Sequence, residues 1–293
     1  MKGLTVLDDE EQRAFEAAHF GIRSWIFESL RRLSVGVDSN STSLEELETF
    51  KETISCAFEL CLTTGKLEVL LSHDESVRLQ LGVLDSIVPV LDLFSSGLPE
   101  SMAARAVYYR FKHAQLTASL HPRLSDGRLK WLRTVVDFWR SLVVSNYFGT
   151  DYVMADPFKE GGVAMQELGT MLCSRQAFAE GTEILREAAQ LHDKTLSGYD
   201  RIRIAARNDI AEARIAYAET LVNLGICGID QGGLEALQAS VVALQSALRV
   251  DLSGSPVSSA SEVRAVRDAA EDHLAKATTM LKKKRVLRRK RQV

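Results

Sequence analysis

The chain has few prolines, no paired cysteines and no long apolar runs, and each shortage excludes a class of protein. Only five prolines occur among 293 residues, and no run alternates apolar and polar residues as a half-buried strand does. No apolar segment approaches the ~18 residues that span a bilayer. The first residues, MKGLTVLDDEEQ, lack the apolar core of a secretory signal. With 46% hydrophobic and 26% charged residues, the composition is that of an ordinary globular protein, which we expect to be intracellular.

Cysteine is scarce and scattered. The four cysteines, Cys56, Cys61, Cys173 and Cys227, form no Cys-x-x-Cys pair. Metal sites and redox motifs normally show closer spacing, and disulfides are rare inside cells. We therefore expect buried free thiols and a reducing compartment, with no disulfide and no metal.

Recognisable catalytic motifs are also missing. The chain has no GxxxxGK[ST] phosphate loop, no GxSxG elbow and no HExxH helix. His73-Asp74 and His192-Asp193 match the dipeptide of helical metal-dependent phosphohydrolases, but a bound metal needs several donors at once. His192 is better interpreted as the polar end of a helix. We expect no catalytic, cofactor-binding or metal-binding residue, and we predict that the protein is not an enzyme.

Helical signals are abundant. Capping-box patterns open helices at Asp8/Glu11, Ser43/Glu46 and Ser259/Glu262, and Asp156-Pro157 supplies a fourth start. Pro89 should kink or end the helix that contains it, because it lacks a backbone donor. Further helices are expected near 76–94, 99–120, 128–144 and 199–225, and the final helix from about Val263 into the basic tail.

Two stretches of the second half look like one helical hairpin written twice: Ala164–Leu191 and Ala213–Leu248. In each, small residues allow two helices to approach and large residues fill the groove beside them. The first copy places Leu168, Gly169 and Leu172 on one helix and Gly181, Leu185 and Ala188 on the next, with Phe178 near the turn. The second copy places Tyr217, Ala218 and Leu221 on one helix and Ser240, Leu244 and Ala247 on the next.

These positions resemble the signature of tetratricopeptide repeats, degenerate in this chain. The copies are offset by 49 residues (Leu168 to Tyr217) rather than about 34, Met165 replaces the signature tryptophan, and neither copy has the closing proline. The resemblance implies an all-α, right-handed solenoid of antiparallel helix pairs. It also implies a scaffold or adaptor that binds a peptide or helix of another protein within a larger assembly.

The longer breaks suggest how the chain is organised. We expect residues 1–145 to form the amino-terminal helical part, 146–280 the repeat-like hairpins and closing helix, and 281–293 a basic tail. The break at 146–155 (NYFGTDYVMA) is rich in large apolar residues. One continuous solenoid is therefore favoured over two independent domains.

A basic zone interleaved with aromatics lies between residues 101 and 140. Arginine and tyrosine on neighbouring helices can grip phosphate or carboxylate through paired hydrogen bonds. In the alternative interpretation the aromatics are core residues, and the bases form the solvent-exposed face of two ordinary helices. The candidate partner-binding residues are Arg105, Tyr109, Arg110, Lys112, Arg133 and Arg140.

The tail is the strongest charge feature. The segment KKKRVLRRKR contains eight bases and no acid, and without it the chain has 28 basic and 39 acidic residues. Its residues are Lys282, Lys283, Lys284, Arg285, Arg288, Arg289, Lys290 and Arg291. The tail could be a nuclear-localisation signal, a contact to nucleic acid or another polyanion, a contact to anionic lipid or an acidic groove, or a solvated end. The first possibility places the protein in the nucleus; the alternative is the cytoplasm.

Overall fold

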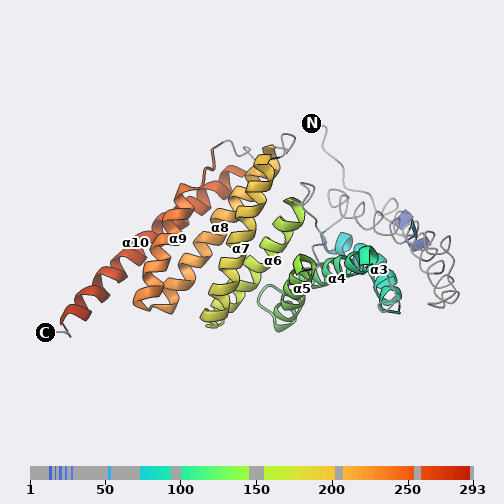
Figure 1. Ribbon diagram of the computed structural model, residues 1–293, viewed down its shortest axis with the longest axis horizontal. Helices are drawn as coiled ribbons and strands as arrows, with labels where there is room; N and C mark the ends of the chain where they lie inside the picture. Colours follow the sequence, from blue (N-terminus) through green and yellow to red (C-terminus); the bar gives the residue numbers. More distant parts are fainter. Residues whose placement is uncertain are drawn as a thin grey trace. The chain divides into compact units, whose positions relative to one another are not determined.

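The computed structural model describes residues 73–93, 100–144, 155–201, 207–253 and 259–290, with nine scattered positions between 13 and 53. Within the described ranges every regular element is a helix, which confirms the all-α prediction (Figure 1). The helices are α3 (His73–Leu93), α4 (Glu100–Ser119), α5 (Asp126–Val144), α6 (Ala155–Ser174), α7 (Phe178–Arg201), α8 (Arg207–Gln231), α9 (Leu234–Arg249) and α10 (Ala260–Lys290). The capping boxes expected at residues 8 and 43 lie outside the described residues.

The chain divides into two compact units, Met1–Tyr147 and Phe148–Val293. In the first unit α3 packs on α4, and α4 packs on α5. Fully buried Leu84, Phe111 and Trp139 fill the space between them. Pro89 lies inside α3 but does not end it, because Val83, Leu84 and Ile87 are buried on the preceding turns and hold the helix in place.

In the second unit each helix packs on the next along the chain, from α6 to α10. In addition α6 contacts α8, and α8 contacts α10. The helix expected over 199–225 was misplaced: α7 continues to Arg201 and α8 runs from Arg207 to Gln231. Buried Thr195 extends the packed face of α7, and buried Ile229 does the same for α8 beyond Gly225.

The two hairpins, α6–α7 and α8–α9, turn in corresponding ways. The turn after α6 contains Gln176, which has a φ of 64°, and the backbone N–H groups of Gln176 and Ala177 donate to the carbonyls of Cys173 and Leu172. This is the Schellman arrangement for ending a helix. The turn after α8 contains Gly232, with a φ of 73° and a bond from its N–H to the Gly228 carbonyl. Gln176 and Gly232, which both have a positive φ, are 56 positions apart, so the turn of the second hairpin follows that of the first by 56 residues.

Glycines lie where the helices of each hairpin cross. A Cβ added to Gly169 would lie 2.7 Å from the Leu185 Cγ, and one added to Gly181 would lie 2.9 Å from the Gly169 carbonyl oxygen. These crossing positions of the first hairpin are the ones expected from sequence. In the second hairpin Gly225 meets Leu244, with a Cβ-to-Cγ distance of 2.5 Å.

The repeat positions predicted on α8 are therefore wrong by seven residues. Ala218 was expected at the crossing, but Gly225 occupies it, 56 residues after Gly169. Ala218 is instead part of a buried cluster shared by α8, α9 and α10. The positions expected on α9 are correct, since Ser240, Leu244 and Ala247 are all buried against its neighbours.

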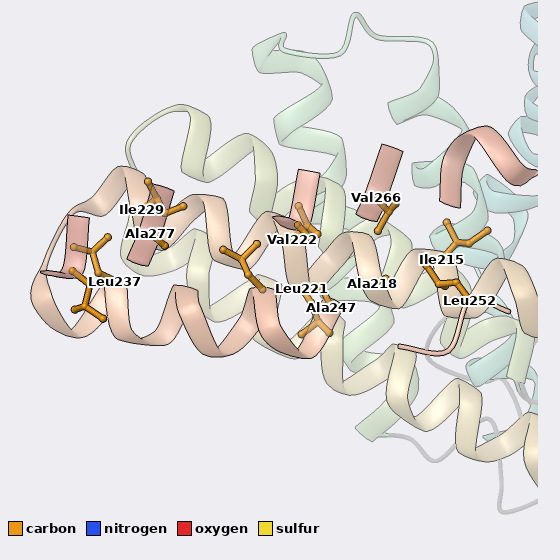
Figure 2. Packing of buried hydrophobic residues seen from close by; sticks show 13 residues of the cluster. Ile215, Ala218, Leu221, Val222, Ile229, Leu237, Ala247, Leu252, Val266 and Ala277 are labelled. Atoms are coloured by element: carbon orange, nitrogen blue, oxygen red, sulfur yellow. The ribbon is translucent and has the colours of Figure 1, made fainter. Parts of the chain in front are cut away.

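The cluster that holds α8, α9 and α10 together is almost entirely aliphatic. Figure 2 shows Leu221 and Val222 on α8 directed into the space shared with Ala247 and Val266. Leu252, in the connection after α9, lies beside Ile215 (Figure 2). Small residues alternate with large ones, so α10 lies close to both other helices.

Candidate functional site

The candidate partner-binding residues of the first unit do not form one surface. Arg133 and Arg140 are exposed on α5, on a strip that also carries Lys130 and Asp137. These positions are three or four residues apart, which aligns them along one side of the helix. Because Asp137 lies between the two arginines, the strip is of mixed charge rather than strongly basic.

The two described candidate cations of α4, Arg110 and Lys112, lie on different sides of the helix. Arg110 and Lys112 are two residues apart, so a rotation of about 200° places them on opposite sides of the helix. Both are partly buried. The Lys112 ammonium lies 5.8 Å from the centre of the Tyr108 ring and donates to the Gln115 side-chain oxygen at 3.4 Å. The side chain of Arg105 lies outside the described residues.

Tyr109 is a core residue, which corrects its assignment to a binding surface. Only 4% of it is exposed. Phe111 and Trp139 are also buried, with ring centres 6.0 Å apart. A ring that is buried between helices cannot contact a partner without unfolding, so these aromatics follow the alternative interpretation, in which they build the core.

The basic tail continues α10 as a helix. Lys282, Lys283, Lys284, Arg285 and Arg288 are all exposed. Arg289 and Lys290 belong to the helix by their backbone, and Arg291 lies outside the described residues. Val286 and Leu287, between the bases, are 52% and 58% exposed.

One contact ties the tail to the second hairpin. The Lys284 ammonium donates to the backbone carbonyl of Gly232, in the turn between α8 and α9. Leu281, one turn earlier, is buried in the α8–α9–α10 cluster. Beyond Leu281 the described side chains of α10 are exposed, so five cations are presented along a helical end.

A ladder of three cross-links joins α6 to α8. The Lys159 ammonium pairs with the Glu212 carboxylate at 2.5 Å. At the next level Gln166 accepts from the Thr220 hydroxyl at 2.8 Å and donates to Glu219 at 3.4 Å. Residues 159, 166 and 173 of α6 are seven apart, which is about two helical turns. Their partners at 212, 219 and 227 on α8 follow in the same order, so the two helices run parallel.

The third cross-link is a disulfide between Cys173 and Cys227, with Cα atoms 5.7 Å apart. It corrects the expectation of free thiols for these two cysteines, while Cys56 and Cys61 lie outside the described residues. Cys227 is 1% exposed, whereas Cys173 is partly exposed. The Thr182 hydroxyl of α7 lies 3.3 Å from the Cys227 sulfur. The sequence held no signal for this pair, because the bond depends on the register between two hairpins.

Burial perturbs two titratable groups of α8, Glu219 and Tyr217. It raises the pKa of Glu219; the hydrogen bond from Gln166 opposes this rise, and the charge of Glu262 adds to it. Burial also raises the pKa of Tyr217, and the negative charge of Asp193 raises it further. Each shift favours the neutral form of its group.

His192 is the most unusual polar residue of the second unit. It is fully buried in α7, and neither ring nitrogen has a hydrogen-bond partner. A Cβ added to Gly162 of α6 would lie 2.7 Å from the imidazole Cε1, so the glycine makes room for the ring. Burial, and secondarily the charge of Lys159, lowers the pKa of His192 to about 4. His192 is therefore a neutral core residue and not the polar helix end expected from sequence.

The described residues bring together no metal-binding group. No three histidine, cysteine or acidic side chains within the described ranges are placed to share an ion. Within those same ranges, no helix combines the length and the apolar character of a membrane span.

Comparisons with known proteins give no family. No family model matches the chain, and no curated protein matches its sequence. The chain is similar to a solved structure titled "Computational Design of Self-Assembling Cyclic Protein Homooligomers", with 10% identity over 93% of this chain and 99% of that one. The TM-score of 0.31 is too low for this similarity to bear on fold or function.

Proposed function

We propose that the protein is a non-catalytic scaffold or adaptor of the tetratricopeptide-like type, which binds another protein within a larger assembly. The observation that supports this proposal is the pattern of helix contacts in the second unit. Each helix packs on its neighbour in sequence, and α6, α8 and α10 also contact each other in turn. Stacked hairpins of right-handed solenoids have this pattern, because each hairpin buries its apolar face on the next.

The outer surface of α10 fits the closing helix of such a stack. Val266, Ala270 and Ala277 are buried against α8 and α9. Arg264, Arg267 and Asp268 are exposed on other sides of the helix. A polar outer face is what a terminal helix needs to keep a stack of hairpins soluble.

The exposed arginines of α5 are our candidate contact to the partner. Arg133 and Arg140 are planar, permanently charged donors that suit the carboxylates of an acidic peptide or helix. The test is chemical cross-linking and capture with the full chain, comparing the unaltered protein with R133E/R140E. A matched control, R186E/R249E, reverses two exposed arginines of the second unit.

If the proposal holds, the unaltered protein and R186E/R249E capture the same defined partner, and R133E/R140E loses it while its melting temperature is kept. Recovery of no stoichiometric partner by the unaltered protein would contradict the scaffold function. Equal capture by all three proteins would remove the α5 strip from the binding surface.

A second candidate function is binding of a polyanion, and the exposed bases of α10 favour it. Replacing Lys282, Lys283, Arg285 and Arg288 by glutamine removes four charges with residues that favour helix, and it retains Lys284. Binding of a short DNA duplex should then weaken, and the slope of log K against log[salt] should fall in magnitude by about 0.9 for each phosphate that is no longer neutralised. An unchanged slope would reject this function.

The same variant tests the nuclear-signal interpretation. Fused to a fluorescent protein and expressed in cells, the unaltered chain should accumulate in the nucleus and the four-glutamine variant should not. Equal distribution of the two fusions would reject the nuclear-signal interpretation of these four bases.

A further inference from the structure

Cys173 and Cys227 share one bond but differ in how far each residue is exposed. Cys173 is partly exposed on α6, and Cys227 is 1% exposed on α8. Thiol–disulfide exchange requires a thiolate to reach one sulfur along the axis of the bond. Cys173 is therefore the more accessible of the two residues, and Cys227 is placed as the leaving group.

The leaving sulfur has a polar neighbour. The Thr182 hydroxyl lies 3.3 Å from the Cys227 sulfur. In the disulfide the sulfur can only accept from this hydroxyl. When the bond breaks, the same hydroxyl donates to the thiolate that forms, and after protonation the thiol can donate in return. Both oxidation states thus retain a partner inside the protein.

We propose that the Cys173–Cys227 disulfide is a one-sided thiol-exchange site, independent of the proposed scaffold function. A small external thiolate attacks the Cys173 sulfur and forms a mixed disulfide there, while Cys227 leaves as a thiolate beside Thr182 and takes up a proton. A second external thiolate then attacks the external sulfur of the mixed disulfide. This releases the oxidised small thiol as its own disulfide, and Cys173 leaves and is protonated. Two small thiols are oxidised and the protein disulfide is reduced to two thiols.

The first measurement maps the mixed disulfide. Full-length protein is incubated with reduced glutathione, quenched with acid and digested with trypsin. Residues 160–175, 215–249 and 52–66 form separate peptides, so Cys173, Cys227 and the Cys56/Cys61 pair are distinguished by mass. The expected result is glutathione on the 160–175 peptide and a free thiol on the 215–249 peptide. Glutathione on the 215–249 peptide would overturn the proposal, as would free thiols on both peptides before incubation.

Variants that lack one of the two bonded cysteines test access without the need to reduce the disulfide. In C227S the remaining Cys173 should react with an aromatic disulfide reagent at least about tenfold faster than Cys227 does in C173S, since the buried thiol must wait for local opening. Peptide mapping assigns the reacting residue in each variant. Equal rates, or a faster Cys227, would overturn the assignment of the attacked sulfur.

Thr182 is tested by a conservative pair. T182V removes the hydroxyl at nearly constant volume and should slow opening by glutathione by about fivefold, because the leaving thiolate loses its donor. T182S restores the hydroxyl and should restore the rate. T170V, which alters an exposed threonine elsewhere on α6, should leave the rate unchanged. If T182S is as slow as T182V, the hydroxyl has no part in the exchange and that step is wrong.

Discussion

Among the residues that the structure describes, His192 has the largest pKa shift caused by burial. In the unfolded chain its pKa lies near the ordinary value of 6.5, whereas in the folded protein the pKa is lowered to about 4. Between these values the unfolded state binds more protons, so stability is fully present above pH 6.5 and falls as pH falls towards 4. At pH 5 the loss amounts to about 2 kcal/mol.

The substitution H192L should remove this dependence. Leucine fills much of the same volume and has no polar atoms to leave unpaired. Between pH 7 and pH 5, the unaltered protein should lose about 2 kcal/mol more of its free energy of unfolding than H192L does. Urea denaturation at the two pH values measures both losses. Parallel pH dependences of the two proteins would show that His192 does not titrate as a buried neutral residue.

Gly181 is a residue that cannot be enlarged. An added Cβ would lie 2.6 Å from the Cys173 sulfur and 2.9 Å from the Gly169 carbonyl oxygen. Alanine normally stabilises a helix interior relative to glycine by about 1 kcal/mol. Here we expect G181A to lower the free energy of unfolding by about 1–3 kcal/mol, since the backbones must separate. Chemical denaturation measures the change, and a neutral or stabilising effect would contradict the close crossing.

One helix crossing was predictable from the sequence and the other was not, for a definite reason. Leu168-Gly169 and Gly181 were identified because small residues follow the helical period. In α8 the same period admits Ala218 and Gly225 equally, since seven residues are two turns and point to one face. Only the position of the turn between α8 and α9 distinguishes Ala218 from Gly225. The one sequence feature that favours Gly225 is the dipeptide Leu224-Gly225, which repeats Leu168-Gly169.

At the scale of the element, α9 begins with an imperfect cap. Gly233 precedes the helix in an extended conformation and offers no side chain to the free N–H groups of the first turn. The nearest atom to a Cβ added there is the Ala236 Cβ, at an ordinary 3.8 Å. The position is therefore open to a capping residue.

We expect G233S to stabilise the protein by a few tenths of a kcal/mol, because serine accepts from the N–H groups that glycine leaves to water. Thermal unfolding should show a small rise in melting temperature. G233A serves as the control, since it adds the Cβ without the oxygen and should not stabilise. A gain in G233A equal to that in G233S would assign the effect to the unfolded chain rather than to the cap.

Helix existence was predictable, but helix ends were less so. Helices α3, α4 and α5 begin and end within a few residues of the expected ranges, because their apolar periodicity is clear. The start of α8 was misplaced because buried positions continue in α7 beyond His192. The assignment of Tyr109 failed for a related reason: periodicity identifies a face, and its neighbours decide whether that face is covered.

At the scale of the molecule, the second unit should depend on its disulfide and the first should not. The bond closes a separation of 54 residues within Phe148–Val293. Loss of such a link typically costs about 2–4 kcal/mol, by restoring freedom to the unfolded chain.

We therefore expect the C173S/C227S variant to lose amide protection in α6 to α9, measured by hydrogen exchange under native conditions. Buried amides of α4 and α5 should exchange at unchanged rates, because these helices belong to the other unit. The single variant C173S also lacks the bond, so it should lose protection in the same helices. Equal loss of protection in both units would show that the effect of the disulfide is not confined to the second unit.

The α6–α8 bond has a further consequence for a chain that has been cut. A protease that cleaves the backbone once, anywhere between residues 173 and 227, leaves two fragments that remain covalently joined. Such a nicked molecule would migrate at full size in a non-reducing gel and separate into two bands only after a reductant is added. The connection between α7 and α8 could then be opened while both fragments stay in one molecule.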